Sequence, residues 1–304
     1  MLSANNSVSS EEMYNYICDF LKEYEYDRLS SDCLLSVYNQ IAANPETFCL
    51  MEQIFQLYRT DYLCDFDIIF NKADQIAQAL YVHEFTVELL VFICLSKYLR
   101  NFYLEKGITL TYYQNSMSDL KYKADECMLV YGIVGSFVAK WFVGFFRLSR
   151  FGIGRLQFEV IPFGDTYNKN GMVLTPDTKV LNVHIPRSKE PLTEDACIEA
   201  YREAKAYFKT EVESDPCPFV CDSYLLYPEN EAFLPPKTNT YRFFKSFDIL
   251  SARIDRERKN LWRLFDTHEK NIDRLPADTS MRRAFIEHLK KGGKIGEGRG
   301  ILFI

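Results

Sequence analysis

Two side chains that can accept a proton lie on neighbouring predicted strands. The run Leu156 to Glu159 alternates apolar and polar residues, which places Glu159 on the polar face of a strand. His184 lies near the end of a second alternating run, Val180 to Ile185. An imidazole titrates close to neutral pH, and a carboxylate can take a proton directly or through water. Glu159 and His184 are therefore candidate general bases, with a salt-bridged glutamate and a structural histidine as the alternatives.

The second strand leads into a helix through a turn that could bind an anion. Pro186 lacks a backbone donor and ends the strand, and a helix predicted over 192–210 begins with amides that have no partner within the helix. Those amides and the helix dipole favour an anion, and the planar cation of Arg187 suits a diphosphate. Three acidic side chains around the same turn oppose that role: Glu190, Glu194 and Asp195.

The pattern changes along the chain from helical to mixed. Residues 1–150 carry apolar residues at helical spacing, with a long apolar helix predicted from Glu84 to Leu104 at the centre of a bundle. From Gly152 onward strands alternate with single helices. The strand candidates are 153–163, 179–186, 218–226, 248–256 and 260–266, and the helix candidates are 192–210, 238–247 and 279–291. The glycine-rich end, Gly292 to Gly300, is predicted to cap the last helix and then form a loop.

Several of these stretches resemble one family. GRLQFE, VLNVHIPRS, PLTEDACIEAYREAKAYF, PKTNTYRFF and DTSMRRAFIEHLKKGG resemble the GNAT-like N-acyltransferases that carry a helical N-terminal domain. The resemblance is clear over most of residues 115–304, and the N-terminal helices share only the pattern. It implies an α+β protein, with a helical N-terminal domain over 1–150 followed by a mixed β-sheet domain of the acyl-CoA N-acyltransferase (GNAT) type over 151–304.

The resemblance also implies an activity. It is the transfer of an acyl group from acetyl-CoA or another acyl-CoA, with acetyl transfer preferred, to the amine of an unidentified small molecule or peptide, without a metal. Tyr241 lies on the helix that runs beside the CoA sulfur in this fold, so it joins Glu159 and His184 as a catalytic candidate, with Tyr224 as second choice. The cofactor-binding candidates are Val183, Ile185, Arg187, Ser188, Leu192, Thr193 and Asn239, with helix capping as the alternative role for Asn239.

One departure from the family pattern leaves a second function open. The usual pyrophosphate signature is Gln or Arg, two residues, Gly, one residue, and then Gly or Ala. The corresponding turn here, Arg187 to Leu192, contains no glycine. The alternative is therefore a non-catalytic member of the fold that binds a ligand or serves as an interaction scaffold.

Composition excludes some classes of partner. A net charge of −6 argues against general nucleic-acid binding, which needs a basic surface. The nine cysteines fall mostly singly within apolar helical pattern, and MLSANNSVSSEEM lacks the features of a signal peptide. A reducing cytoplasm is the expected location. Cys217 and Cys221 have no second pair or adjacent histidine, which disfavours a zinc site.

One apolar segment raises the question of a membrane. Met128 to Phe146 is apolar except for Lys140, which interrupts it after about a dozen residues, whereas a span needs about 20. We expect a buried or interdomain helix here, and no membrane partner. The sequence gives no oligomeric state.

Overall fold

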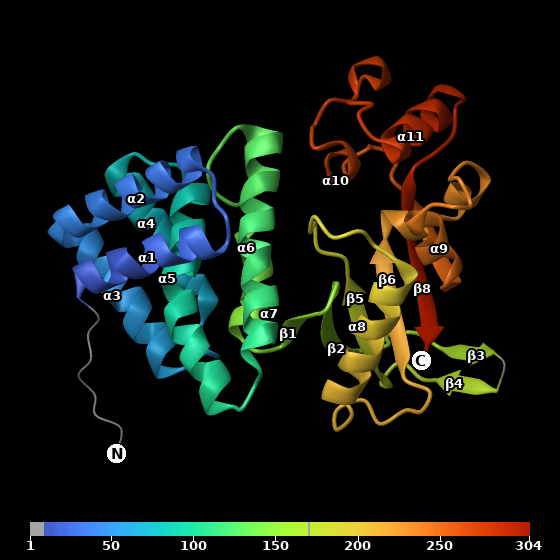
Figure 1. Cartoon of the computed structure of the whole chain (residues 1–304), viewed down its shortest axis with the longest axis horizontal. Coiled ribbons are helices and arrows are strands. Elements are labelled where there is room, and N and C mark those ends of the chain that lie inside the picture. Colours follow the sequence, from blue (N-terminus) through green and yellow to red (C-terminus); the bar gives the residue numbers. More distant parts are fainter. Residues whose placement is uncertain (1–8, 170) are drawn as a thin grey trace. The chain divides into compact units, whose positions relative to one another are not determined.

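The computed structural model describes residues 9–169 and 171–304. The chain forms two compact units, which divide between Leu148 and Ser149. The first unit is helical and the second is built on a mixed β-sheet (Figure 1).

The long helix α5 forms the centre of the first unit. Its side chains are buried on almost every face, and α1, α2, α3, α4 and α6 all pack against it. A helix that is apolar all round must be covered by its neighbours, so the predicted central helix is confirmed. The helices are α1 (Ser10–Glu23), α2 (Arg28–Ala43), α3 (Pro45–Thr60), α4 (Phe66–Leu80), α5 (Glu84–Glu105), α6 (Leu110–Tyr131) and α7 (Val143–Phe146).

The apolar segment Met128–Phe146 is not the single helix that its composition suggested. Helix α6 ends at Tyr131, where Gly132 takes a left-handed conformation with φ of 69°. A loop, a 3₁₀ turn over Ala139–Phe142 and the short α7 follow. A side chain at Gly135 would overlap the backbone of Phe85, so the loop passes directly against the start of α5. Within the part of the chain that the structure describes, no helix has the length and apolarity needed to cross a bilayer.

The second unit is a six-stranded mixed sheet with helices, in the order β1-β2-β5-β6-β8-β7 among the described residues. All neighbours are antiparallel except β5 and β6. The strands are β1 (Arg150–Ile153), β2 (Leu156–Pro162), β5 (Lys179–His184), β6 (Pro218–Ser223), β7 (Asp248–Ile254) and β8 (Gly296–Phe303), with β3 (Tyr167–Lys169) and β4 (Met172–Leu174) as a separate hairpin. The helices are α8 (Glu194–Tyr207), α9 (Asn239–Lys245), α10 (Leu261–Phe265) and α11 (Ser280–Lys290). The fold class expected from the resemblance is confirmed.

The two faces of the sheet are covered differently. On one face, Phe158 of β2 and Phe219 of β6 contact Tyr201 of α8, with ring centroids 5.0 to 6.1 Å apart. On the other face, the loop after β2 and the β3–β4 hairpin cover Val180 and Val220. Figure 1 shows α10 and α11 beyond one end of the sheet and the β3–β4 hairpin at the other end.

Gly292 follows the last helix with a φ of 85°, as the predicted cap requires, but Gly296–Phe303 forms the interior strand β8, so the loop predicted there is wrong. Gly296, Gly298 and Gly300 alternate along β8, so all three face the same side of the sheet. A side chain at Gly298 would overlap the carbonyl group of Leu226, and one at Gly300 would press on Phe247. Glycine is required at Gly298 because the backbone of Leu226 lies directly against the strand, and at Gly300 the side chain of Phe247 fills the same space.

The strand predicted over 260–266 is also wrong, because this segment forms α10. Its apolar residues Leu261, Leu264 and Phe265 have helical spacing, and they pack in a cluster with Phe285 and Leu289 of α11. A short apolar run is compatible with either element, and this packing partner decides for the helix.

Gly298→Ala should destabilise the protein by about 1–3 kcal/mol, because the added methyl group has no space under Leu226 and the strand must shift. Ser251→Ala on the exposed part of β7 is the control and should change stability by less than about 0.5 kcal/mol. Urea unfolding followed by circular dichroism measures both. Equal stability of Gly298→Ala and wild type would contradict the close approach.

Candidate active site

The parallel strands β5 and β6 separate near the candidate residues. Their ladder consists of the pairs Leu181–Phe219 and Asn182–Val220, although β5 continues to His184 and β6 to Ser223. The strand ends therefore diverge, and Val183 and His184 lie on the β5 side of the opening. This is the open end between two central strands at which a ligand can reach backbone groups that no strand partner occupies.

Five polar side chains lie on one face of β1, β2 and β5. Register places Glu159 opposite Asn182 and Gln157 opposite His184, so these residues share the face opposite to Phe158. His184 Nε2 lies 2.7 Å from Glu159 Oε1, and Asn182 Nδ2 donates to the same oxygen at 3.0 Å. Arg150 donates to the second oxygen, Oε2, at 2.8 Å. The two predicted bases are thus brought into direct contact.

The charge of Glu159 determines the tautomer of His184. Partial burial of Glu159 opposes its ionisation, but the hydrogen bond with His184, the charge of Arg150 and the hydrogen bond from Asn182 outweigh that effect and lower its pKa to about 2. An ionised carboxylate only accepts hydrogen bonds. His184 must therefore carry its proton on Nε2 at the 2.7 Å contact, which leaves the lone pair of the neutral ring on Nδ1.

A buried arginine holds the turn between β5 and α8. Arg155 is 8% exposed and follows Gly154, whose φ of +55° allows the tight β1–β2 connection. Its Nε donates to the carbonyl of Glu190 at 2.8 Å, and its Nη1 donates to the carbonyl of Pro186 at 3.1 Å. Both ends of the glycine-free turn are therefore fixed by one side chain.

Arg187 is engaged by a carboxylate from another part of the unit. Its guanidinium makes a bidentate ion pair with Asp266, which also pairs with Arg282 of α11. Asp266 ends α10 in a left-handed conformation, and its side chain is 11% exposed. The predicted phosphate ligand thus joins the turn to α10 and α11, whereas the Oγ of Ser188 next to it is buried with no hydrogen-bond partner among the described residues.

The remaining predicted residues lie at the starts of α8 and α9. Thr193 caps α8, and its hydroxyl accepts from the amide of Ala196. Thr238, rather than Asn239, caps α9, so the capping role considered for Asn239 is wrong. Tyr241 is partly buried, and together with Tyr224 it packs against the α10–α11 cluster.

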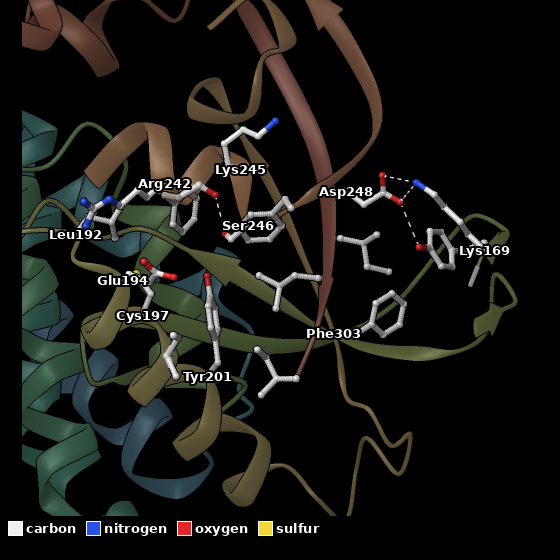
Figure 2. Close-up of a pocket in the computed structure, with 17 residues that line it drawn as sticks. Lys169, Leu192, Glu194, Cys197, Tyr201, Arg242, Lys245, Ser246, Asp248 and Phe303 are labelled. Atoms are coloured by element: carbon white, nitrogen blue, oxygen red, sulfur yellow. Dashed lines mark hydrogen bonds and ion pairs between the residues drawn. The ribbon is translucent and has the colours of Figure 1, made fainter. Parts of the chain in front are cut away.

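A pocket of about 680 Å³ lies between α8, α9 and the end of β8, within the size range of small-molecule sites (Figure 2). Leu192, Glu194 and Arg242 line one end of it, next to the β5–α8 turn, and Lys169 and Asp248 line the other. Figure 2 shows the hydroxyl of Tyr201 pointing into this space. Tyr201 is 3% exposed, and its hydroxyl has no hydrogen-bond partner among the described residues.

Comparisons with known families match both units. The GNAT-like C-terminal domain family matches residues 150–302, which is half of the chain. The N-acyltransferase N-terminal domain family matches residues 17–148. The chain belongs to the GNAT-like N-acyltransferases. No curated protein matches it significantly.

Solved acyltransferases share the fold of this N-acyltransferase family member. One structure of an acyltransferase in complex with decanoyl-CoA and teicoplanin is 19% identical, with a TM-score of 0.73, and the match covers 94% of this chain and 87% of that one. An acyltransferase in complex with decanoyl-CoA alone is 18% identical, with a TM-score of 0.72, and the match covers 94% and 86% of the two chains. At this identity the likeness establishes the fold.

Sequence reasoning missed three residues that shape the site in this family member. Arg150 and Asn182 complete the contacts of Glu159, and Arg155 holds the β5–α8 turn. Asn182 and His184 are two residues apart on one predicted strand, and this spacing indicates that they share a face. Arg150 required the β1–β2 register, and Arg155 required the position of a turn more than 30 residues away.

Glu159→Gln should lower stability at neutral pH by about 3 kcal/mol, since it removes the charge of a partly buried ion pair with Arg150. The folded-state pKa of Glu159, about 2, lies below its ordinary value of 4.5, so the ionised form stabilises the fold above pH 4.5. That contribution is lost as the pH falls from 4.5 towards 2. The stability difference between wild type and variant should therefore shrink in acid.

Urea unfolding at pH 7, 5, 4 and 3 measures this difference, with the exposed Glu203→Gln on α8 as control. The control should stay within about 0.5 kcal/mol of wild type at neutral pH. A difference between wild type and Glu159→Gln that is the same at every pH would show that Glu159 is not held ionised by its neighbours.

Proposed function

We propose that this protein is an acyl-CoA-dependent N-acyltransferase in which His184 is the general base and Glu159 orients it. The contact of 2.7 Å between His184 and Glu159, at the end of β5 where β6 diverges, carries this proposal. A carboxylate that accepts from one ring nitrogen fixes the tautomer and favours the imidazolium formed when the other nitrogen takes a proton.

Glu159 itself is poorly suited to be the base. A carboxyl group with a pKa of about 2 has little affinity for the proton of an amine. Arg150, Asn182 and His184 all stabilise the ionised form, so proton uptake would weaken their contacts with Glu159. The role of base therefore passes to His184, and Glu159 acts through it.

The proposed reaction has one addition and one elimination. The amine nitrogen of the acceptor attacks the thioester carbonyl, a C–N bond forms, and the nitrogen gives its proton to His184 Nδ1. The tetrahedral intermediate then collapses, the C–S bond breaks, and the CoA thiolate leaves. Tyr241 of α9 is proposed to donate the proton that the thiolate takes up. Solvent then accepts the proton held by His184 and returns one to the phenolate of Tyr241.

The donor is proposed to bind along the β5–α8 turn. The unpartnered hydroxyl of Ser188, the start of α8 at Thr193 and the diverging backbone at Val183 and Ile185 support this placement. The pocket that begins at Leu192 continues from the turn between α8 and α9, and Asn239 is the first residue of α9. Arg187 would contribute by holding the turn on Asp266.

The chemical range of the substrates is proposed from the family and its solved relatives. The solved acyltransferases hold decanoyl-CoA, and one holds teicoplanin. For the present chain we propose acyl-CoA donors from acetyl-CoA upward and an amine on a small molecule or peptide as acceptor. A panel of acetyl-, octanoyl- and decanoyl-CoA distinguishes the preferred acyl length.

CoA should stabilise the folded protein if the donor site is correct. A ligand at about 100 times its Kd adds about 2.7 kcal/mol to stability, which corresponds to several degrees in Tm. Differential scanning fluorimetry with CoA and each acyl-CoA measures the shift, and ATP at the same concentration is the control for nonspecific anion binding. No shift with any CoA derivative, or an equal shift with ATP, would refute the donor site.

His184→Ala should lower the rate of acyl transfer about 10²–10⁴-fold, the usual effect of losing a general base. Glu159→Gln should have a smaller effect on rate and should alter the pH dependence, because it removes the group that orients the ring. Tyr241→Phe should lower turnover modestly and leave CoA affinity nearly unchanged. Thiol release from acyl-CoA in the presence of an amine panel measures all three.

Equal thiol release by wild type and His184→Ala would exclude His184 as the base. CoA binding without thiol release for any donor and amine would favour the non-catalytic alternative, in which the same site binds a ligand without turning it over. The contact between Glu159 and His184 is the observation that favours the enzyme over that alternative.

A further inference from the structure

The β5–α8 turn lacks the glycines that are usual in a turn that binds phosphate. In a turn that binds phosphate, backbone amides must point at the anion, and glycines usually permit the close approach. Residues 187–192 contain no glycine here. Some other interaction must therefore set the direction of the peptide groups in this turn.

The side chain of Arg155 is placed to do so. It reaches the carbonyl of Pro186 at the start of the turn and the carbonyl of Glu190 near its end, at 3.1 Å and 2.8 Å. A guanidinium presents its donors in a rigid plane, so two carbonyls bound to one such group are fixed relative to each other. Arg155 is 8% exposed, and its hairpin is packed on α8, where a side chain at Gly154 would touch Ala200.

The direction of the carbonyls determines the direction of an amide. The peptide group is planar and trans, so the N–H that follows a carbonyl points the opposite way. Because the Pro186 carbonyl points at Arg155, the N–H of Arg187 points away from it. The residue after Glu190 is Pro191, which has no N–H to misdirect. Next to that amide lies the buried, unpartnered hydroxyl of Ser188.

We propose that Arg155 is a positioning residue for the donor: it replaces the missing glycine signature by fixing the turn, so that the Arg187 amide and the Ser188 hydroxyl receive a phosphate group of the acyl-CoA. This inference rests on the proposed function, because it assumes that the donor binds at this turn. It assigns to Arg155 no contact with the reacting atoms. Its effect is on the affinity for the phosphate-bearing part of the donor.

The proposed role of Arg155 affects the binding of the donor's phosphate part and not the reaction of its thioester part. Arg155→Ala should weaken CoA binding about 10–100-fold, the equivalent of losing charge-assisted hydrogen bonds that hold the turn. The KM for octanoyl-CoA should rise by a similar factor while kcat changes less than about 3-fold. Octanoyl-pantetheine, which carries the same thioester without phosphates, should react equally well with wild type and variant.

The experiment combines titration calorimetry with CoA and thiol-release kinetics with both donors on the full chain. Arg155→Lys is the second variant: a lysine keeps the cation but cannot hold two carbonyls in a plane, so it should restore only part of the CoA affinity. Arg202→Ala, an exposed arginine on α8, is the matched control and should bind CoA as wild type does. Circular dichroism establishes that each variant is folded.

The outcomes distinguish this inference from the function on which it rests. A wild type that binds no CoA refutes the donor site, and with it the role of Arg155. If the wild type binds CoA, and Arg155→Lys binds it with equal affinity and has an unchanged KM, the role of Arg155 alone is overturned. Equal loss of activity with octanoyl-CoA and octanoyl-pantetheine overturns it as well, because that pattern indicates general damage to the fold.

Discussion

The ionised carboxylate of Glu159 is the group around which the site is arranged. A partly buried negative charge is costly unless charges and hydrogen bonds compensate it, and here Arg150, Asn182 and His184 each contribute one contact. These partners come from the two strands on either side of β2, so the compensation exists only when β1, β2 and β5 are in their observed register. A shift of one residue would move Glu159 to the face covered by α8, where it would meet the aromatic side chains around Tyr201.

The turn after β5 depends on arginines in a different way. Arg155 holds the carbonyls of the turn from the β1–β2 connection, and Arg187 extends from the turn to Asp266 at the end of α10. Asp266 is shared with Arg282, so the turn, α10 and α11 are joined by one carboxylate. In this turn, side chains fix the backbone conformation that glycines permit in the usual signature. The turn can therefore keep its shape without that signature.

The two faces of the sheet carry different kinds of side chain. One face carries the aromatic contacts with α8, and the other carries the polar group at Glu159 and the hairpin cluster around Val180. The strands β5 and β6 share only two ladder pairs before they separate. On the far side of β6, the glycines of β8 allow Leu226 and Phe247 to lie directly on the sheet. The sheet is closely packed on that side. It opens beside β5, where the β5–β6 ladder ends.

The sequence by itself determined the local features. Periodicity predicted the helical first unit and the strands that carry Glu159 and His184, because alternation and helical spacing are properties of neighbouring residues. The family resemblance added the order of elements in the second unit. Tertiary structure decided the rest. Gly298 and Gly300 lie in the interior strand β8 with Leu226 and Phe247 directly against them, and Leu261 to Phe265 form a helix because α11 offers a matching cluster. The same holds for Arg155 and Arg187: their partners are distant in sequence, and only the folded chain brings a carbonyl of Glu190 or a carboxylate of Asp266 within hydrogen-bonding distance.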